Sequence, residues 1–238
     1  MGSSQTQWEA VFWDIGGVIL EHESIRRAHQ TFIEALVEEF DLDVSSETAL
    51  ETWQQAVGDH FHERDGTEFR LAEDGYHRGV AAVTDETVEK GVWRPLFDDA
   101  FVNHIEPKPN ALTTLEALAE RDIHLGIISD IDNREAEAIL AAFDLNSTFD
   151  SVTTSEEVGR TKPDAAMFET ALAKSSSAPN RSLMIGDRYS HDMKGATNTG
   201  MGTIAYGADD GPAVDYRLSD LQAVIDVLDG TYEQESPN

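Results

Sequence analysis

The chain has 238 residues, of which 40% are hydrophobic, and its 17 Lys and Arg stand against 46 Asp and Glu, a formal net charge of −29. This length suffices for one large domain or for a core with a smaller inserted domain. So acidic a surface repels phosphate backbones, which excludes nucleic acid as an expected partner. The charge also favours a salt-loving host, because salt shortens the Debye length to roughly 3 Å at 1 M and relieves the mutual repulsion.

Cysteine is absent, which excludes disulfides, thiolate zinc sites and cysteine nucleophiles. No run approaches the roughly 18 apolar residues that a membrane-spanning helix needs, and residues 1–7 lack a basic and apolar leader. We therefore expect a cytoplasmic protein with no membrane partner. Residues 231–238 are polar, which predicts a disordered tail.

Five short runs of apolar or β-branched residues predict strands. These runs are residues 8–14, 123–129, 149–154, 182–187 and 202–206. Helical patterns alternate with strands from about residue 110 onward, and a last amphipathic helix is expected through Leu218 to Leu228. The alternation predicts an α/β protein with a parallel sheet.

The starts of three helices can be predicted from local signals. Asp132 with Glu135 three residues later indicates a capping box. Pro163 suits a first helical position, and Ser190 is a candidate cap for a helix that ends near Gly200.

The segment between the first two strands is different, because it contains no convincing strand. Apolar residues at helical spacing, such as Ile25, Phe32 and Leu36, predict helices there. We expect a helical insertion over residues 21–104, between core segments 1–20 and 105–230. Its expected hinges are Gly16-Gly17 at one exit and residues 107–109 at the other.

Four polar residues stand at the ends of apolar runs or at a helix start. Asp14 follows Val11 to Trp13, Ser129 follows Leu125 to Ile128, Lys162 precedes Pro163, and Asp187 follows Leu183 to Gly186. The carboxyl ends of neighbouring parallel strands converge on one crevice. The four residues are therefore candidates for a single active site.

Each of these residues also has a plainer explanation. A strand-terminal Asp before Gly16-Gly17 can simply form a turn, Ser129 can begin the next turn, and Lys162 can be a surface lysine. Asp187 and Asp192 form the most specific pair, because carboxylates gathered after a buried strand suit Mg²⁺. Solvated carboxylates are the alternative in so acidic a chain.

In order and spacing, these pieces resemble the haloacid dehalogenase superfamily of hydrolases over nearly the whole chain. The matching pieces are Asp14-Ile15-Gly16-Gly17-Val18, Ile127-Ile128-Ser129-Asp130, Lys162-Pro163-Asp164 with Phe168, and Gly186-Asp187 with Asp192, Gly195-Ala196 and Gly200-Met201. The resemblance implies a Rossmann-like core with an α-helical cap inserted between the first two motifs.

The resemblance also implies a reaction. Asp14 would attack phosphorus to give an aspartyl-phosphate, which water then hydrolyses. Ser129, Lys162 and the backbone near Asp130 would hold the phosphoryl group of a small phosphorylated metabolite.

A metal site is implied by the same resemblance. Mg²⁺ would be held by Asp14, Asp187 and the backbone carbonyl of Gly16, with Asp192 in support. The cations would neutralise the repulsion between an anionic carboxylate and an anionic ester.

The chain departs from the family at Gly16, where most of its phosphatases carry a second Asp as general acid and base. His22 or a residue of the cap is the expected substitute, unless the leaving group is good or turnover is slow. His191 lies within the loop between Asp187 and Asp192 and is a further candidate to touch the site.

Three functions remain open from the sequence. The first is a Mg²⁺-dependent phosphomonoester hydrolase. The second is a 2-haloacid dehalogenase, which needs no metal and gains nothing from an acidic pair. The third is a catalytically weak binding or regulatory protein, which Gly16 favours. The identity of the substrate and the oligomeric state are not predicted.

Overall fold

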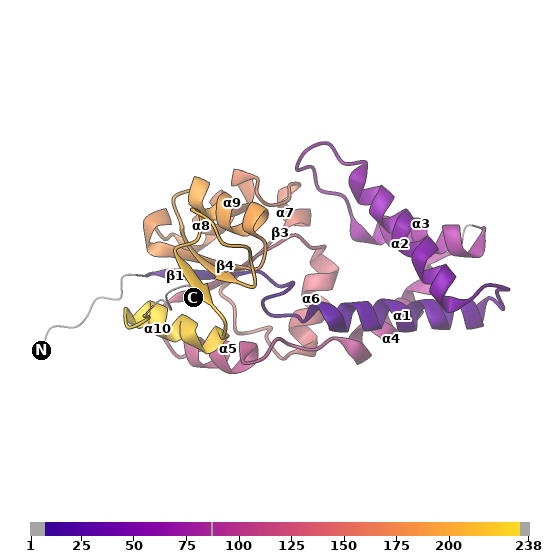
Figure 1. Ribbon diagram of the computed structural model, residues 1–238, viewed down its shortest axis with the longest axis horizontal. Helices are drawn as coiled ribbons and strands as arrows, with labels where there is room; N and C mark the ends of the chain where they lie inside the picture. The colour runs from indigo at the N-terminus through magenta and orange to yellow at the C-terminus, as the bar shows by residue number, and fades with distance from the viewer. Residues whose placement is uncertain (1–7, 87, 234–238) are drawn as a thin grey trace, which may run out of the picture.

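The computed structural model describes residues 8–86 and 88–233, and its centre is one sheet of six parallel strands in the order β3-β2-β1-β4-β5-β6. The order is that of a Rossmann-type sheet, with the topological switch point beside β1. The predicted α/β class is therefore confirmed (Figure 1). The strands are β1 (Ala10–Trp13), β2 (His124–Ser129), β3 (Ser151–Thr154), β4 (Ser182–Gly186), β5 (Gly202–Tyr206) and β6 (Tyr216–Leu218).

Alternate residues of the strands feed two separate apolar layers, because successive strand side chains point to opposite faces. Phe12 packs in a cluster with Met167 and Phe168 of α8, whereas Trp13 belongs to the cluster that holds Leu115 of α5 and Val224 of α10. The two faces are thus covered by α8 (Ala165–Ser175) with α9 (Lys194–Asn198), and by α5 (Ala111–Ala119) with α10 (Val224–Asp229) (Figure 1).

Four helices fill the chain between β1 and α5, as the sequence predicts. They are α1 (His22–Glu39), α2 (Ser46–His62), α3 (Ala72–Thr84) and α4 (Lys90–His104). Phe32, Trp53, Trp93 and Phe97 are almost fully buried and form the aromatic centre of this helical unit. We call α1–α4 with their connections the cap; its division from the core as a separate domain stays a prediction.

Backbone-to-backbone contacts join the cap to the core at two places in the described residues. At the first, Leu20 bridges Pro107 in antiparallel fashion, so the two expected hinge segments run side by side. At the second, the α2–α3 connection reaches the core, where Thr161 N donates to Thr67 O at 2.8 Å and Phe69 N donates to Gly159 O at 3.1 Å. The second link holds the cap against the segment that carries Lys162.

Two predicted helix caps are wrong in their partners. α6 (Asn133–Ala142) does begin after Asp132, but the carboxylate accepts from Ala72 N at 3.0 Å and Glu73 N at 3.2 Å instead of from its own helix. It therefore caps α3 across the core–cap boundary. Ser190 caps nothing, because it lies inside a short π-helix, Tyr189–Met193, that runs directly into α9.

Three further expectations shift along the chain. Pro163 precedes α8, whose N-cap is Asp164. The expected last helix is shorter, because Tyr216–Leu218 forms β6 and α10 begins at Val224. Thr231 and Tyr232 donate backbone N–H groups to Asp226 O, so these residues of the expected tail are anchored; residues 234–238 lie outside the described part.

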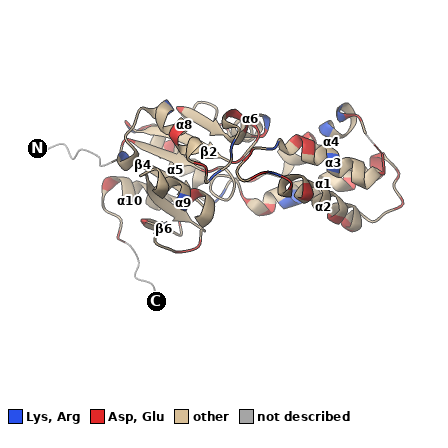
Figure 2. Cartoon of the chain, turned by 90° about the horizontal axis from the view of Figure 1, so that it is seen from above, with Lys and Arg blue, Asp and Glu red and all other residues tan. Residues whose placement is uncertain are grey.

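Acidic residues are spread over helices and loops of both the core and the cap (Figure 2). Within residues 8–86 and 88–233, no helix is both long and apolar enough to cross a membrane. The remaining α-helix is the short α7 (Ser155–Val158), which precedes the segment of Lys162.

Candidate active site

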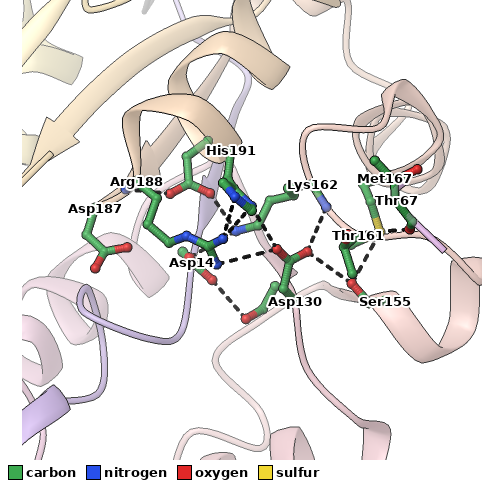
Figure 3. Close-up of polar contacts among 12 residues, drawn as sticks. Asp14, Thr67, Asp130, Ser155, Thr161, Lys162, Met167, Asp187, Arg188 and His191 are labelled. Carbon is green, nitrogen blue, oxygen red and sulfur yellow. Dashed lines mark hydrogen bonds and ion pairs between the residues drawn. The ribbon is translucent and has the colours of Figure 1, made fainter. Parts of the chain in front are cut away.

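Asp14 lies directly after β1 and is held by β4, by the end of β2, by Ile15 and by Lys162. Its backbone N–H donates to Ile185 O of β4 at 3.0 Å, and its Oδ1 accepts from Ser129 Oγ, at the end of β2, and from Ile15 N, both at 2.8 Å. Its Oδ2 lies 2.9 Å from Lys162 Nζ. The carboxylate is therefore fixed in one orientation at the carboxyl edge of the sheet (Figure 3).

Lys162 is fully buried and has three partners for its three ammonium N–H donors. Besides Asp14 Oδ2, they are Asp192 Oδ1 at 2.6 Å and Ile128 O at 3.0 Å. The surface-lysine explanation is thus excluded for this residue. Its charge neutralises the carboxylates, and its donors are all engaged within the protein.

Asp14, Asp187 and Asp192 form an acidic cluster in which one carboxylate oxygen of each lies within 4.8 Å of the others. Asp192 Oδ1 forms an ion pair with Lys162 but has no hydrogen-bond partner in the described residues, and its Oδ2 accepts from Arg188 N at 2.9 Å. Asp187 Oδ1 is buried and has no hydrogen-bond partner in the described residues. An unpartnered buried oxygen beside two carboxylates is the donor chemistry that fits a hard divalent cation.

Gly17 makes this arrangement possible. Its φ is +74°, and a Cβ added there would lie 2.0 Å from Asp187 Oδ2. Glycine is required at this position on both counts, the left-handed backbone and the close approach of Asp187.

The pKa values of the cluster follow from burial and mutual repulsion. Burial raises the pKa of Asp14 to about 7, with Asp192 and Asp130 adding to the shift and Lys162 opposing it. Burial and the charge of Asp192 raise the pKa of Asp187. The pKa of Lys162 is raised, because its carboxylate neighbours outweigh the effect of burial. A cation among these carboxylates would favour their ionised forms.

Asp130 is the centre of a second set of contacts beside the nucleophile candidate. Its Oδ1 accepts from Lys162 N at 2.7 Å and from Ser155 Oγ at 3.0 Å. Its Oδ2 faces His191 Nδ1 at 3.4 Å and the guanidinium Nη1 of Arg188 at 3.6 Å (Figure 3). Burial opposes ionisation, but the His191 hydrogen bond and the nearby positive charges lower the pKa of Asp130.

The space beside Gly16 is bordered by His22, the first residue of α1. A Cβ added to Gly16 would lie 3.4 Å from His22 Nε2, and the same nitrogen is 3.8 Å from Asp187 Oδ2. The His22 side chain is 50% exposed. An imidazole therefore stands next to the position at which most phosphatases of the family carry their second Asp.

The four residues singled out from the sequence do meet at one edge of the sheet, together with Asp130 and Asp192. Two further residues of the site could not be predicted from the positions of the strand ends. Ser155 supports Asp130, and Arg188 projects over it. Arg188 did carry one sequence signal, because it is a cation directly after Asp187 in a strongly acidic chain. His191, a weaker candidate, also touches Asp130.

Comparison with known proteins places the chain among characterised folds. Residues 11–206 match the model of the family described as haloacid dehalogenase-like hydrolase. A glyceraldehyde 3-phosphate phosphatase of Methanothermobacter thermautotrophicus is 38% identical over 100 residues, which are 42% of this chain and 44% of that protein. A ribulose-1,5-bisphosphate 5-phosphatase of Halopiger xanaduensis is 32% identical over 107 residues, 45% of each chain.

The chain thus spans a little under half the length of these two curated relatives in the matched regions. A solved structure of a HAD phosphatase from Thermococcus onnurineus superposes with a TM-score of 0.70 at 23% identity, covering 93% of this chain and 98% of that one. At this identity the structural likeness supports the fold.

Proposed function

Since the chain belongs to the haloacid dehalogenase-like hydrolases, we propose that it is a Mg²⁺-dependent phosphomonoester hydrolase that acts on a small phosphorylated metabolite through an aspartyl-phosphate. One observation carries the proposal. The carboxylate of Asp14 is fixed between Ser129 and Lys162 and lies in a cluster with Asp187, whose Oδ1 is buried without a hydrogen-bond partner in the described residues.

The protein's own groups divide the work as follows. Asp14 attacks the phosphorus atom, so that a bond from its carboxylate oxygen to phosphorus forms while the bond to the leaving oxygen breaks. Ser129 Oγ and Ile15 N orient Oδ1, and Lys162 holds Oδ2 and neutralises its charge. Water then attacks phosphorus, which releases phosphate and restores the Asp14 carboxylate.

The oxygen donors suit Mg²⁺, which Asp14, Asp187 and the backbone carbonyl of Gly16 would hold. Its contribution would be to draw negative charge from the phosphoryl oxygens as the carboxylate approaches. Asp192 supports the site through Lys162 and Arg188 N.

The names of the relatives support a proposal for the substrate class. The names of two relatives specify a triose phosphate and a pentulose bisphosphate, both small phosphate esters, and we propose a substrate of this kind. The site lies at the edge of the sheet beneath the cap, whose residues would contact the part of the ester that leaves.

A panel of phosphomonoesters that includes these two compounds tests the proposal, assayed in molar KCl with Mg²⁺ or with EDTA. Phosphate release that requires Mg²⁺ and vanishes in Asp14→Asn supports it. Halide release from 2-haloacids without metal would instead identify a dehalogenase. Neither activity, with stabilisation by a phosphate ester, would identify a binding protein.

A further inference from the structure

We infer that Arg188 is a substrate-binding residue whose guanidinium exchanges Asp130 for an oxyanion of the phosphate ester. The inference rests on the proposed function and names a group that the four motif residues do not include. It follows from three features of the site: which donors are already used, which cations can move, and what holds Asp130 when Arg188 leaves.

The site has few donors to spare for a phosphate. The Lys162 ammonium donates to Ile128 O and forms ion pairs with Asp14 and Asp192, and the Ser129 hydroxyl donates to Asp14. Arg188 has five N–H donors in a planar fork that suits phosphate or carboxylate. In the described residues its guanidinium contacts Asp130 Oδ2 at 3.6 Å and the ring nitrogens of His191 at 2.5 and 2.6 Å.

Charge at the site points the same way. The ester must approach four carboxylates, those of Asp14, Asp130, Asp187 and Asp192. Among the residues that the structure describes, Lys162 and Arg188 are the Lys and Arg side chains that form ion pairs with them. Lys162 is 0% exposed, whereas the Arg188 side chain is 43% exposed. Arg188 is therefore the permanent cation of the pair that an incoming anion can reach.

Arg188 is fixed at its backbone, and its guanidinium lies closer to the His191 ring than to Asp130. Its backbone N–H donates to the buried Asp192 Oδ2 at 2.9 Å, which fixes the Cα beside Asp187. At 3.6 Å the guanidinium is beyond normal hydrogen-bond distance from Asp130. A rotation of the side chain can thus exchange Asp130 for an anion without moving the acidic cluster of Asp14, Asp187 and Asp192.

Asp130 keeps its other partners when the guanidinium leaves. Oδ1 still accepts from Lys162 N and Ser155 Oγ, and Oδ2 still faces His191. The exchange therefore does not strand a buried carboxylate, and the anion gains a charge-assisted contact with several free donors.

Steady-state kinetics of Arg188→Gln and Arg188→Lys test the inference, with Arg121→Gln as the matched control. Arg121 lies beyond the opposite end of β2 and pairs with Asp229, so the control makes the same charge change far from the site. We expect Arg188→Gln to raise KM by about 10- to 100-fold, the usual size for a charged hydrogen bond, with kcat within about threefold. The KM of Arg188→Lys should lie between those of the wild type and Arg188→Gln, because lysine keeps the charge but lacks the planar set of N–H donors. Thermal unfolding confirms that each variant is folded.

Two probes locate the oxyanion. If Arg188 holds the transferred phosphoryl group, KM rises for glyceraldehyde 3-phosphate and for ribulose 1,5-bisphosphate alike, and inorganic phosphate binds more weakly. If it holds a second anionic group, KM rises for the bisphosphate alone. Either pattern supports the inference, and a KM equal to that of the Arg121→Gln control for both esters overturns it.

A failure of the proposed function can be distinguished from a failure of the inference about Arg188. If the wild type releases no phosphate from any ester, the hydrolase proposal fails, and calorimetry with inorganic phosphate and Mg²⁺ still tests Arg188. Weaker phosphate binding in Arg188→Gln then supports the inference, and equal affinity in the two proteins overturns it.

Discussion

Lys162 Nζ lies closer to Asp192 Oδ1, at 2.6 Å, than to Asp14 Oδ2, at 2.9 Å, and both Lys162 and Asp192 are fully buried. The cation is thus shared between the nucleophile candidate and a carboxylate that also fixes the backbone of Arg188. The helical loop after β4 and the end of β1 are connected through this one ammonium group.

Removing that ammonium group should destabilise the metal-free protein. Lys162→Met leaves two buried carboxylates facing each other, and we expect a loss of about 3–5 kcal/mol in the free energy of unfolding. Mg²⁺ should restore part of the loss, because it supplies positive charge to the same carboxylates. Denaturant unfolding in molar KCl with EDTA or Mg²⁺ measures both effects.

The matched control is Lys90→Met, which removes a half-exposed lysine paired with Glu73 in the cap. It should cost about 1 kcal/mol or less and show no response to Mg²⁺. Equal losses in the two variants would contradict a shared buried cation at Lys162.

The close approach of Gly17 and Asp187 can be tested by a substitution that adds one methyl group. Gly17→Ala places a Cβ 2.0 Å from Asp187 Oδ2 at a φ of +74°, so Asp187 must move. We expect at least a hundredfold loss of Mg²⁺-dependent turnover, on the order of one misplaced catalytic group. Gly66→Ala is the control, because its φ is +57° with nothing within 4 Å of the new Cβ. It should carry the backbone strain of about 1 kcal/mol and retain activity.

The raised pKa of Glu135 predicts how the free energy of unfolding depends on pH. Burial, helped by Asp132, raises the pKa of Glu135 to about 7 in the folded protein, against an ordinary value of 4.5. The native state therefore binds a proton that the unfolded state has lost, so this group's contribution to stability falls as pH rises from 4.5 to 7. Arg94 opposes the shift, Asp98 adds to it, and the Tyr76 hydroxyl donates to Oε2 at 3.5 Å.

Glu135→Gln removes the charge and keeps an acceptor for that hydroxyl. We expect the variant to gain up to about 3 kcal/mol over the wild type at pH 8, relative to the difference at pH 5. Denaturant unfolding at the two pH values measures this gain. Glu137→Gln, an exposed change on the same helix, is the control. A constant difference between Glu135→Gln and the wild type at both pH values would show that Glu135 ionises normally.

The departure at Gly16 predicts a gain of function. Gly16→Asp adds a carboxyl group where most phosphatases of the family carry their general acid, and the nearest contact of the new Cβ is His22 Nε2 at 3.4 Å. We expect kcat to rise by about tenfold or more on alkyl phosphates, whose leaving group needs a proton. Aryl phosphates with good leaving groups should change little, and Gly16→Asn should give no gain. A gain on neither class of ester would argue against a missing proton donor.

The sequence predicts the parts of this site that depend on strand ends. Asp14, Ser129 and Asp187 each follow a buried run, and the parallel sheet brings such ends together without any knowledge of loops. Lys162 could be placed only by its motif, since its contacts depend on how the segment before α8 packs.

The errors arise where a side chain finds a partner far away in sequence. Asp132 has the local signal of a capping box, but Ala72 N and Glu73 N from the cap compete for its carboxylate and receive it. The β6 strand is only Tyr216–Leu218, too short to show a period. Arg188 stands just before the π-helix after β4, and its contacts with Asp130 and His191 depend on how that loop folds.

The most direct test of the account is to trap the covalent intermediate. Wild-type protein is mixed with a turning-over phosphate ester and Mg²⁺, quenched in acid within milliseconds and digested, and the peptide that contains Asp14 is weighed. We predict that this peptide gains the mass of one phosphoryl group, and that the gain is absent with EDTA and in Asp14→Asn. Rapid phosphate release with no phosphorylated Asp14 at any quench time would contradict the central claim.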